Sequence, residues 1–403
     1  MTGATIDHMI SVTILIAALM IAMLTYTNMF ATAVDYDRNR QVANKAVDLI
    51  NTICLSSGNP TDWGETNASV LGFGLQDPKV GGYALSPYSV MRLNSGNQLV
   101  NYSRTGLSYN NISTNYGDAI LTPIDNCINY HAIAELLGVN GTYGFGVDIT
   151  PTLNVNVSQV TADHLMLNVA VSGSGLPLSG ATIHYYLFHV VSGSPYPSIT
   201  MYPLNPPGVA EIRPSGSVDI DFPLAADSVY AFVAYVSLGG VNGVGYISNR
   251  VDDDTFIVPF IDGYEDGYLT LILAHSGEIL NPAEDAIAYY NASFYTLTSD
   301  FHLQRVKIAN STGVLKAGTE QICNTTQIPA SETGLLVISY LDDEEDKLGT
   351  IMVPLGIGAL GLSLSYGSGL GSDDYDFVAT ELRQVTIDGI SYQVKVSTWK
   401  LGS

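Results

Sequence analysis

Basic side chains are scarce in this sequence. Lys and Arg together number 15 in 403 residues, whereas Asp and Glu number 38, and the net charge is −23. Charged residues make up 13% of the chain, about half the usual share, so the negative charge comes from missing bases and not from added acids. A phosphate backbone is bound through clustered Lys and Arg, and the sequence contains no such cluster. The composition therefore excludes ordinary nucleic-acid binding.

Cysteine and catalytic motifs are also lacking. Cys54, Cys127 and Cys323 lie far apart, with no CxxC pair and no closely spaced Cys/His group, which argues against a structural zinc site. Three cysteines leave room for one disulfide and one free thiol. The sequence contains no GxSxG, HExxH or P-loop motif, and no GxGxxG after a predicted strand. It therefore predicts a protein that is not an enzyme and that uses no organic cofactor.

The longest apolar run lies near the amino terminus. Residues 9–31 carry no charge, and about 20 apolar residues suffice to cross a bilayer as a helix. A secretory signal peptide is the alternative, but it needs a basic start and a shorter apolar core, and residues 1–8 contain no Lys or Arg. We therefore predict a retained transmembrane helix.

The helical pattern continues beyond this run. Apolar residues recur on one helix face at Val42, Ala46, Leu49, Ile50 and Ile53. Gly58 and Pro60 then end the pattern. Residues 6–55 are thus expected to form one helix, apolar all round in its first half and amphipathic in its second. It is either an anchor with a short stalk or a helix that packs beside copies of itself.

Two signals disagree about membrane orientation. Arg38, Arg40 and Lys45 follow the apolar run, and the positive-inside rule would place the body in the cytoplasm. Eight N-x-Ser/Thr sequons, roughly twice the chance number, favour an extracellular and glycosylated body. They begin at Asn67, Asn101, Asn111, Asn140, Asn156, Asn291, Asn310 and Asn324. We give the sequons more weight and expect the body outside the cell membrane, on the cell surface or in a filament.

The chain begins with a short leader that ends at Gly3-Ala4, followed by the acid Asp7 and the long helix. In these features the first 150 residues or so resemble archaeal type IV pilin-like surface proteins. The resemblance extends to later segments: Ser57–Gly64, Phe73-Gly-Leu-Gln, Leu85-Ser-Pro, Asp125–Gly138, Tyr143-Gly-Phe and Ile149-Thr-Pro. In that family an acid near the helix start neutralises the terminus of a neighbouring subunit during assembly. The resemblance implies this role for Asp7, and it implies a homo-oligomer formed through the helix.

The rest of the chain divides by pattern into three further regions. Residues 56–150 read as a small mixed α/β module, with helices expected after Ser86-Pro87 and after Thr122-Pro123. Residues 151–251 contain six short alternating strands with regular turns, the pattern of an immunoglobulin-like sandwich. Residues 252–403 are expected to form a second β-rich domain, with a hairpin at Asp388-Gly389. With the helix of residues 1–55, the predicted fold class is α+β and mainly β.

Acidic turns are the candidate metal ligands. Six carboxylates fall within fifteen residues at the expected domain junction: Asp252, Asp253, Asp254, Asp262, Glu265 and Asp266. Calcium takes six to eight oxygen ligands from such loops, so structural calcium is one hypothesis. The segment has no DxDxDG loop, and solvated acidic turns are the commoner explanation of such a cluster. Weaker acidic clusters occupy Asp342–Asp346 and Asp373–Asp376.

Together these features predict a membrane-anchored extracellular structural protein of the pilin-like class. A monomeric adhesin or carbohydrate-binding protein is the alternative, with Tyr185-Tyr186 and Tyr289-Tyr290 available to stack on sugars. A surface hydrolase that uses carboxylate pairs and an archaeal viral surface protein share the same composition.

Overall fold

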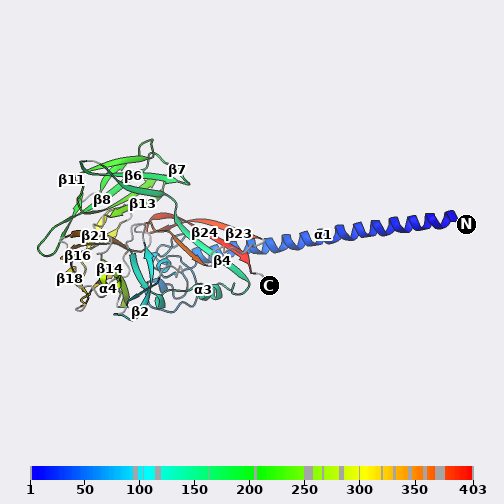
Figure 1. The fold of residues 1–403 in the computed structure, drawn as a ribbon, viewed down its shortest axis with the longest axis horizontal. Helices are drawn as coiled ribbons and strands as arrows, with labels where there is room; N and C mark the ends of the chain where they lie inside the picture. The colour runs from blue at the N-terminus through cyan, green and yellow to red at the C-terminus, as the bar shows by residue number, and fades with distance from the viewer. Residues whose placement is uncertain are drawn as a thin grey trace.

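A long helix projects from a mainly β body in the computed structural model (Figure 1). The described residues are 2–93, 99–102, 104–113, 119–161, 163–203, 207–248, 257–265, 267–280, 286–298, 300–318, 321–329, 333–343, 347–356, 361–367 and 377–401. The predicted fold class, α+β and mainly β, is confirmed.

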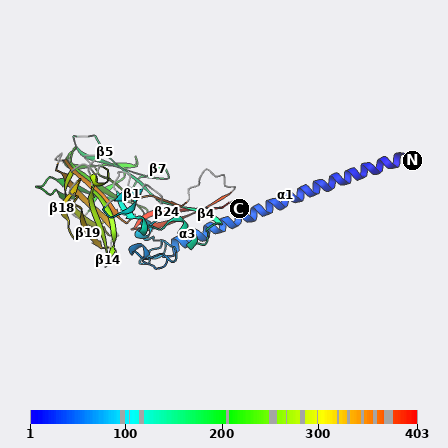
Figure 2. The ribbon, with the colours of Figure 1, turned by 60° about the horizontal axis from the view of Figure 1, so that its bottom comes forward.

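Helix α1 (Thr2–Leu55) is one continuous element of 54 residues. At about 1.5 Å per residue it is roughly 80 Å long. Its first half stands free of the body, and its second half packs against the sheet that contains the carboxyl-terminal hairpin (Figures 1 and 2). The predicted two-part helix over 6–55 is thus present, with its start four residues earlier.

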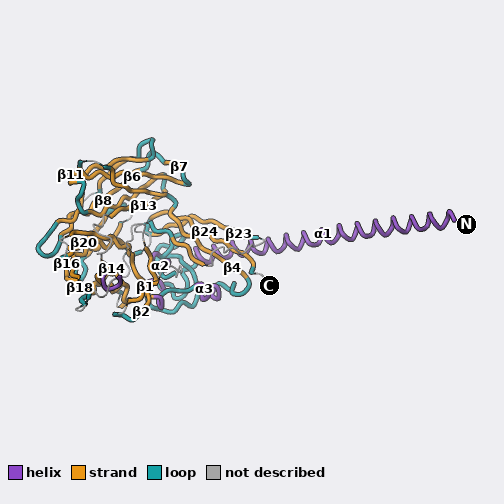
Figure 3. The backbone as a smooth tube through the Cα atoms, viewed as in Figure 1, coloured by secondary structure: helices purple, strands orange, loops and turns teal. Residues whose placement is uncertain are grey.

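Short helices follow α1 around the base of the body (Figure 3): η1 (Trp63–Glu65), α2 (Pro87–Met91), η2 (Ile124–Asn126) and α3 (Tyr130–Leu136). The Ser86 hydroxyl caps α2 by accepting from Ser89 N, as its sequence predicts. The helix predicted from Thr122 is wrong at its start. Thr122-Pro123 ends a strand, and α3 instead begins after Asn129, whose side chain accepts from Ala132 N.

Residues 154–248 form a two-sheet sandwich. Its strands are β5 (Asn154–Val160), β6 (His164–Gly173), β7 (Leu176–Pro177), β8 (Thr182–Val191), β9 (Ser198–Tyr202), β10 (Gly208–Glu211), β11 (Ser217–Ala225), β12 (Tyr230–Leu238) and β13 (Val241–Ser248). One sheet has the order β11-β6-β5, and the other has β8-β12-β13 with β9 and β10 on the outer side of β8. If β5, β6 and β8 are lettered A, B and C, and β11, β12 and β13 are lettered E, F and G, the two sheets are E-B-A and C-F-G. This is the arrangement of an immunoglobulin-like sandwich. The predicted sandwich is therefore present.

Three further sheets make up the rest of the body. The first has the order β1 (Leu99–Tyr102), β2 (Leu107–Ser113), β3 (Ala119–Pro123), β14 (Ile257–Glu265), β15 (Tyr268–His275), β19 (Asn324–Pro329). The second contains β17 (Leu303–Val306), β16 (Ala286–Leu297), β20 (Gly334–Asp342) and β21 (Lys347–Leu355), with β18 (Thr312–Ala317) also on β16. The third has the order β22 (Leu364–Gly367), β4 (Tyr143–Pro151), β24 (Ile390–Lys400), β23 (Val378–Ile387). The short helix α4 (Gly277–Leu280) follows β15.

Strands from the two ends of the chain share these sheets. Phe260 of β14 pairs with Leu121 of β3, and β24 pairs with β4 along nine residues from Tyr392↔Pro151 to Lys400↔Tyr143. Segments 56–150 and 252–403 are therefore hydrogen-bonded into common sheets, and the boundary drawn between them in the sequence does not separate two independent sheets. The sandwich, by contrast, pairs its strands only among themselves in the described residues.

The sandwich also shares its core with the rest of the body. Seven consecutive residues of β12, Tyr230–Val236, are all buried. Their alternate side chains enter two different cores, one inside the sandwich and one shared with the other sheets. Tyr235, for example, stacks on Phe301 with 5.5 Å between ring centroids. The β domains thus form one body from which α1 projects.

Candidate anchoring and assembly helix

The free half of α1 exposes apolar side chains on every face. The large apolar residues from Met9 to Tyr36 are all exposed, and no residue of the most apolar window is buried. Within the described residues, this is the single helix long and apolar enough to cross a membrane, and a signal sequence would have the same composition. The uncharged run of residues 9–31 is roughly 34 Å long, which matches the ~30 Å hydrocarbon core of a bilayer.

Polar side chains in this half are paired within the helix. The hydroxyls of Thr13, Thr25, Thr27 and Thr32 each donate to the carbonyl four residues earlier, at 2.8–2.9 Å. Such bonds leave no unpaired hydroxyl when the helix enters an apolar phase. The run ends near Asp35, whose carboxylate lies 3.7 Å from the Arg38 guanidinium with both side chains exposed.

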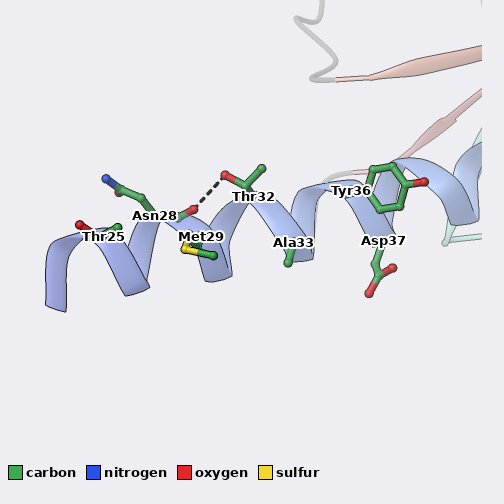
Figure 4. Close-up of a pocket in the computed structure, with 7 residues that line it drawn as sticks. All are labelled: Thr25, Asn28, Met29, Thr32, Ala33, Tyr36 and Asp37. Atoms are coloured by element: carbon green, nitrogen blue, oxygen red, sulfur yellow. Dashed lines mark hydrogen bonds between the residues drawn. The ribbon is translucent and has the colours of Figure 1, made fainter. Parts of the chain in front are cut away.

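Two neighbouring stripes of the free half contain shallow grooves. One is lined by Leu19, Ala22, Met23, Tyr26, Thr27 and Phe30 and is almost entirely apolar. The other is lined by Thr25, Asn28, Met29, Thr32, Ala33, Tyr36 and Asp37 (Figure 4). Both sets recur at spacings of three and four residues, which is the spacing at which side chains share one helix face. The second stripe mixes polar and apolar groups, and small side chains at Ala22 and Ala33 allow a partner helix to approach closely.

The second half of α1 is held rigidly by the body. Val42 and Ala46 pack with Ala379 of β23, and Leu49, Ile50, Ile53 and Cys54 enter the main core. The amphipathic face predicted from the sequence is therefore the buried face. Its burial fixes the direction in which the free half leaves the body.

A buried arginine fixes the segment that follows the helix. Arg92 is 5% exposed, and its guanidinium lies 5.3 Å from the centroid of the Trp63 ring. It donates to the carbonyls of Asn126 at 2.6 Å, of Thr66 at 2.8 Å and of Trp63. Burial lowers the pKa of Arg92. One of only 15 bases thus connects the end of α2 to two other segments, Trp63–Thr66 and the one that contains Asn126.

Asp7, which the resemblance implies in assembly, lies on α1, whereas the sequons lie on the body. Asp7 lies in the amino-terminal part of α1, and its side chain is outside the described part of the structure, as is that of Asn111. Asn67, Asn101, Asn140, Asn156 and Asn310 are exposed. The amide nitrogens of Asn291, Asn310 and Asn324 donate to the carbonyls of Pro197, Thr325 and Val314 at 2.7–2.9 Å. Asn67, Asn101, Asn140 and Asn156 are thus exposed, and no described hydrogen bond uses their amide nitrogens, although the Asn101 amide oxygen accepts from the Ser108 hydroxyl at 2.6 Å.

The acidic junction falls largely outside the described residues. Asp252, Asp253, Asp254 and Asp266 are not described, nor are Glu344–Asp346 and Asp373–Asp376. Asp262 and Glu265 are exposed on β14, and Asp262 sits at the register shift between Ile261 and Gly263. In the described part of the chain, no three His, Cys, Asp or Glu side chains gather as a metal site. Structural calcium at this junction stays a prediction.

The tyrosine pairs proposed for sugar stacking point partly inward. Tyr186 and Tyr290 are fully buried, and their hydroxyls bond to Leu303 N and to Asn310 O. Tyr185 packs against Phe222 and Phe232. These three residues therefore form core contacts. Tyr289 is half-buried and meets the exposed Tyr196 edge-on, with 6.0 Å between ring centroids, so sugar stacking there stays a prediction.

Sequence reasoning missed a buried polar pair beside β15. The Tyr102 hydroxyl donates to Glu278 Oε2 at 2.7 Å, and Glu278 is 5% exposed. Burial raises the pKa of the Glu278 carboxyl. The two residues lie far apart in sequence, so no local motif could have indicated the contact. The cysteines are free thiols, with Cys54 buried and Cys127 and Cys323 partly buried.

Comparison with known proteins finds no matching family model and no matching curated protein. Among solved structures, the D0-D1 domain of intimin is 13% identical, with 54% of this chain and 98% of that chain covered at a TM-score of 0.22. A two-domain structure of extended-synaptotagmin 2 is 10% identical, with 64% and 91% covered at a TM-score of 0.10. TM-scores this low carry no argument about function.

Proposed function

We propose that this protein is a membrane-anchored extracellular structural subunit of the pilin-like class, which assembles with copies of itself through α1. The observation that carries the proposal is the two-part helix. One half is buried in the body, and the other exposes some 34 Å of uncharged apolar surface.

A signal peptide alone would not need the second half of α1, which packs on the body. The buried contacts of Leu49, Ile50 and Ile53 make α1 part of the folded body, so loss of the whole helix would remove core residues. Because the helix continues without interruption from the body into the apolar run, it holds the body at a set angle to whatever surrounds the run. A filament core or a bilayer would both bury this surface, and the pilin-like resemblance of Gly3-Ala4 and Asp7 favours assembly.

The two stripes allow the assembly to be tested directly. Single cysteines would be placed at Ala22, on the apolar stripe, and at Asn28, on the mixed stripe, in a background with Cys54, Cys127 and Cys323 replaced by Ser or Ala. Oxidation of membranes or sheared filaments should then give a disulfide dimer through one stripe and not through the other. An isologous contact joins the same face of two copies and would cross-link a single-cysteine variant to itself. A heterologous filament contact joins two different faces and would cross-link the two variants only when they are mixed.

The matched control is a cysteine at Asn44, which is exposed on the half of α1 that packs on the body. Equal and weak cross-linking at all three positions would indicate a helix surrounded by lipid. That result would contradict assembly through α1 and would still agree with a membrane anchor. Release of the protein from membranes by alkaline carbonate would contradict membrane anchoring as well. N-terminal sequencing of the same material tests the processing implied by the resemblance, for which a start at Ala4 is expected.

A further inference from the structure

A small cavity interrupts one edge of the second sheet. Strands β17 and β18 both pair with the same edge of β16, β17 from Phe294 to Leu297 and β18 from Ala286 to Asn291. Ala292 and Ser293 lie between the two ladders. The cavity at this break has a volume of about 250 Å³ and is lined by Ala292, Ser293, Arg305, Val306, Lys307, Ile308 and Ser311.

The cavity wall is fixed in advance by hydrogen bonds. The chain between β17 and β18 is held by Tyr290, whose hydroxyl donates to Asn310 O at 2.9 Å, and by Thr326, whose hydroxyl donates to Ala309 O at 2.7 Å. Ala292 N also donates to Ser311 O at 2.6 Å. A wall held at successive residues loses little conformational freedom when a ligand enters, which favours binding.

Two of the few bases of the chain line this cavity. Arg305 and Lys307 are exposed, and neither forms an ion pair within the part of the chain that is described. By contrast, Lys79, Arg383 and Lys395 each pair with a carboxylate. In a chain of net charge −23, two neighbouring cations without acidic partners form a local positive site that attracts anions.

The position of the cavity suits contact with an external ligand. β16 and β18 lie at the end of the body opposite the exit of α1 (Figure 1). An anchor in the membrane would therefore hold this cavity away from the membrane surface.

We infer that the cavity binds a small carboxylate-bearing sugar of monosaccharide size. The volume is below the range of about 300–1,000 Å³ that is usual for drug-sized ligands. The planar guanidinium of Arg305 matches the two oxygens of a carboxylate, and the Ser311 hydroxyl can exchange a hydrogen bond with a sugar hydroxyl, whereas Ser293 already bonds to the Tyr295 side chain. Val306 and Ile308 offer an apolar wall to the C–H face of the ring. This inference goes beyond the proposed function, which concerns α1 and does not involve β16–β18.

The test uses the full-length protein in neutral detergent at low ionic strength. Glucuronate, glucose and inorganic sulfate are titrated by calorimetry and by saturation-transfer NMR. Glucuronate should bind, and the binding should weaken at least about tenfold in the double variant Arg305→Gln, Lys307→Gln, because charge-assisted hydrogen bonds are lost. Arg213→Gln, which removes an exposed base on the sandwich, should leave binding unchanged.

Three results would overturn the inference. Glucose binding as tightly as glucuronate would show that the bases are not used. Sulfate binding as tightly as glucuronate would show a site for inorganic anions and not for a sugar. Unchanged glucuronate affinity in the double variant, with a melting temperature equal to that of the unsubstituted protein, would place any binding elsewhere. None of these results depends on whether α1 assembles.

Discussion

The Arg92 guanidinium lies over the Trp63 indole, 5.3 Å from its centroid, and also donates a hydrogen bond to the Trp63 carbonyl. A cation this deeply buried is tolerated because its N–H groups reach three backbone carbonyls on two segments, Trp63–Thr66 and the segment that contains Asn126. It stabilises the segment that receives the end of α1, since Trp63, Ile53 and Cys54 belong to the same core.

Replacing Arg92 should therefore destabilise the body strongly. In Arg92→Met the carbonyls of Trp63, Thr66 and Asn126 lose their donor while remaining largely enclosed, and we expect a loss of about 3–5 kcal/mol in the free energy of unfolding. Thermal or denaturant unfolding measures it. Arg213→Met, at an exposed position, is the control and should change stability by less than about 0.5 kcal/mol. Equal effects of the two substitutions would contradict the role given to Arg92.

The hairpin turn at Asp388 should make stability depend on pH. Thr333 Oγ1 donates to Asp388 Oδ1 at 2.8 Å, while Oδ2 is enclosed without a hydrogen-bond partner. Burial, with a smaller contribution from Asp77, raises the pKa of Asp388 from 3.8 to about 7. Between these two values the folded protein keeps a proton that the unfolded chain releases. The free energy of unfolding contributed by Asp388 is therefore fully present below about pH 4 and falls as the pH rises to 7.

Asp388→Asn should remove this dependence. Asparagine tolerates the positive φ of 52° at this position and keeps an acceptor for Thr333. Since one pKa unit is worth about 1.4 kcal/mol, we expect the variant to be more stable than the unsubstituted protein by up to about 4 kcal/mol at pH 8 and to show little gain at pH 4. Denaturant unfolding at both pH values measures the difference between the two proteins, so that the opposite contribution of buried His275, whose pKa burial lowers, cancels. A gain of equal size at both pH values would contradict the pKa assignment.

Removal of the free half of α1 should leave the body folded. No large apolar side chain from Met9 to Tyr36 packs on the body, so deletion of residues 1–37 should give a protein that is soluble without detergent and melts at an unchanged temperature. Gel filtration and thermal melting check both points. Deletion of residues 1–55 is the control. It also removes Leu49, Ile50 and Ile53 from the core, and at about 2–5 kcal/mol for each large side chain lost that protein should not fold. A folded product from the longer deletion would show that the second half of α1 is dispensable.

Glycosylation should follow exposure and not the sequon pattern alone. In a glycosylating host, Asn67, Asn101, Asn140 and Asn156 should carry glycans, because each is exposed. Asn291 should carry none in the folded protein, since it lies within β16 and its amide bonds to Pro197 O. Glycopeptide mass spectrometry decides between the two sets. Occupancy at Asn291 comparable to that at Asn140 would mean that modification precedes folding of this sheet.

Much of the fold could be predicted from local sequence patterns. The α1 helix, the Ser86 cap, the sandwich strands and the Asp388-Gly389 hairpin each rest on residues near one another in sequence, where periodicity, capping and turn conformation act directly. The error at Thr122-Pro123 has the same origin. A Pro two residues before an acid favours a helix start locally, but pairing of β3 with β2 and β14 keeps Thr122 and Pro123 extended.

The sequence by itself determined which elements the protein contains, namely a long apolar helix and many alternating strands. It also determined that very few bases are available to them. Only the tertiary structure decided which segments share a sheet, because the pairing of β4 with β24 joins residues that are over 230 positions apart and no local pattern encodes such a contact. It also decided the places of the scarce bases. Arg92 bonds to carbonyls from two other parts of the chain, whereas Arg305 and Lys307 line a cavity at the place where two strands share one edge of β16.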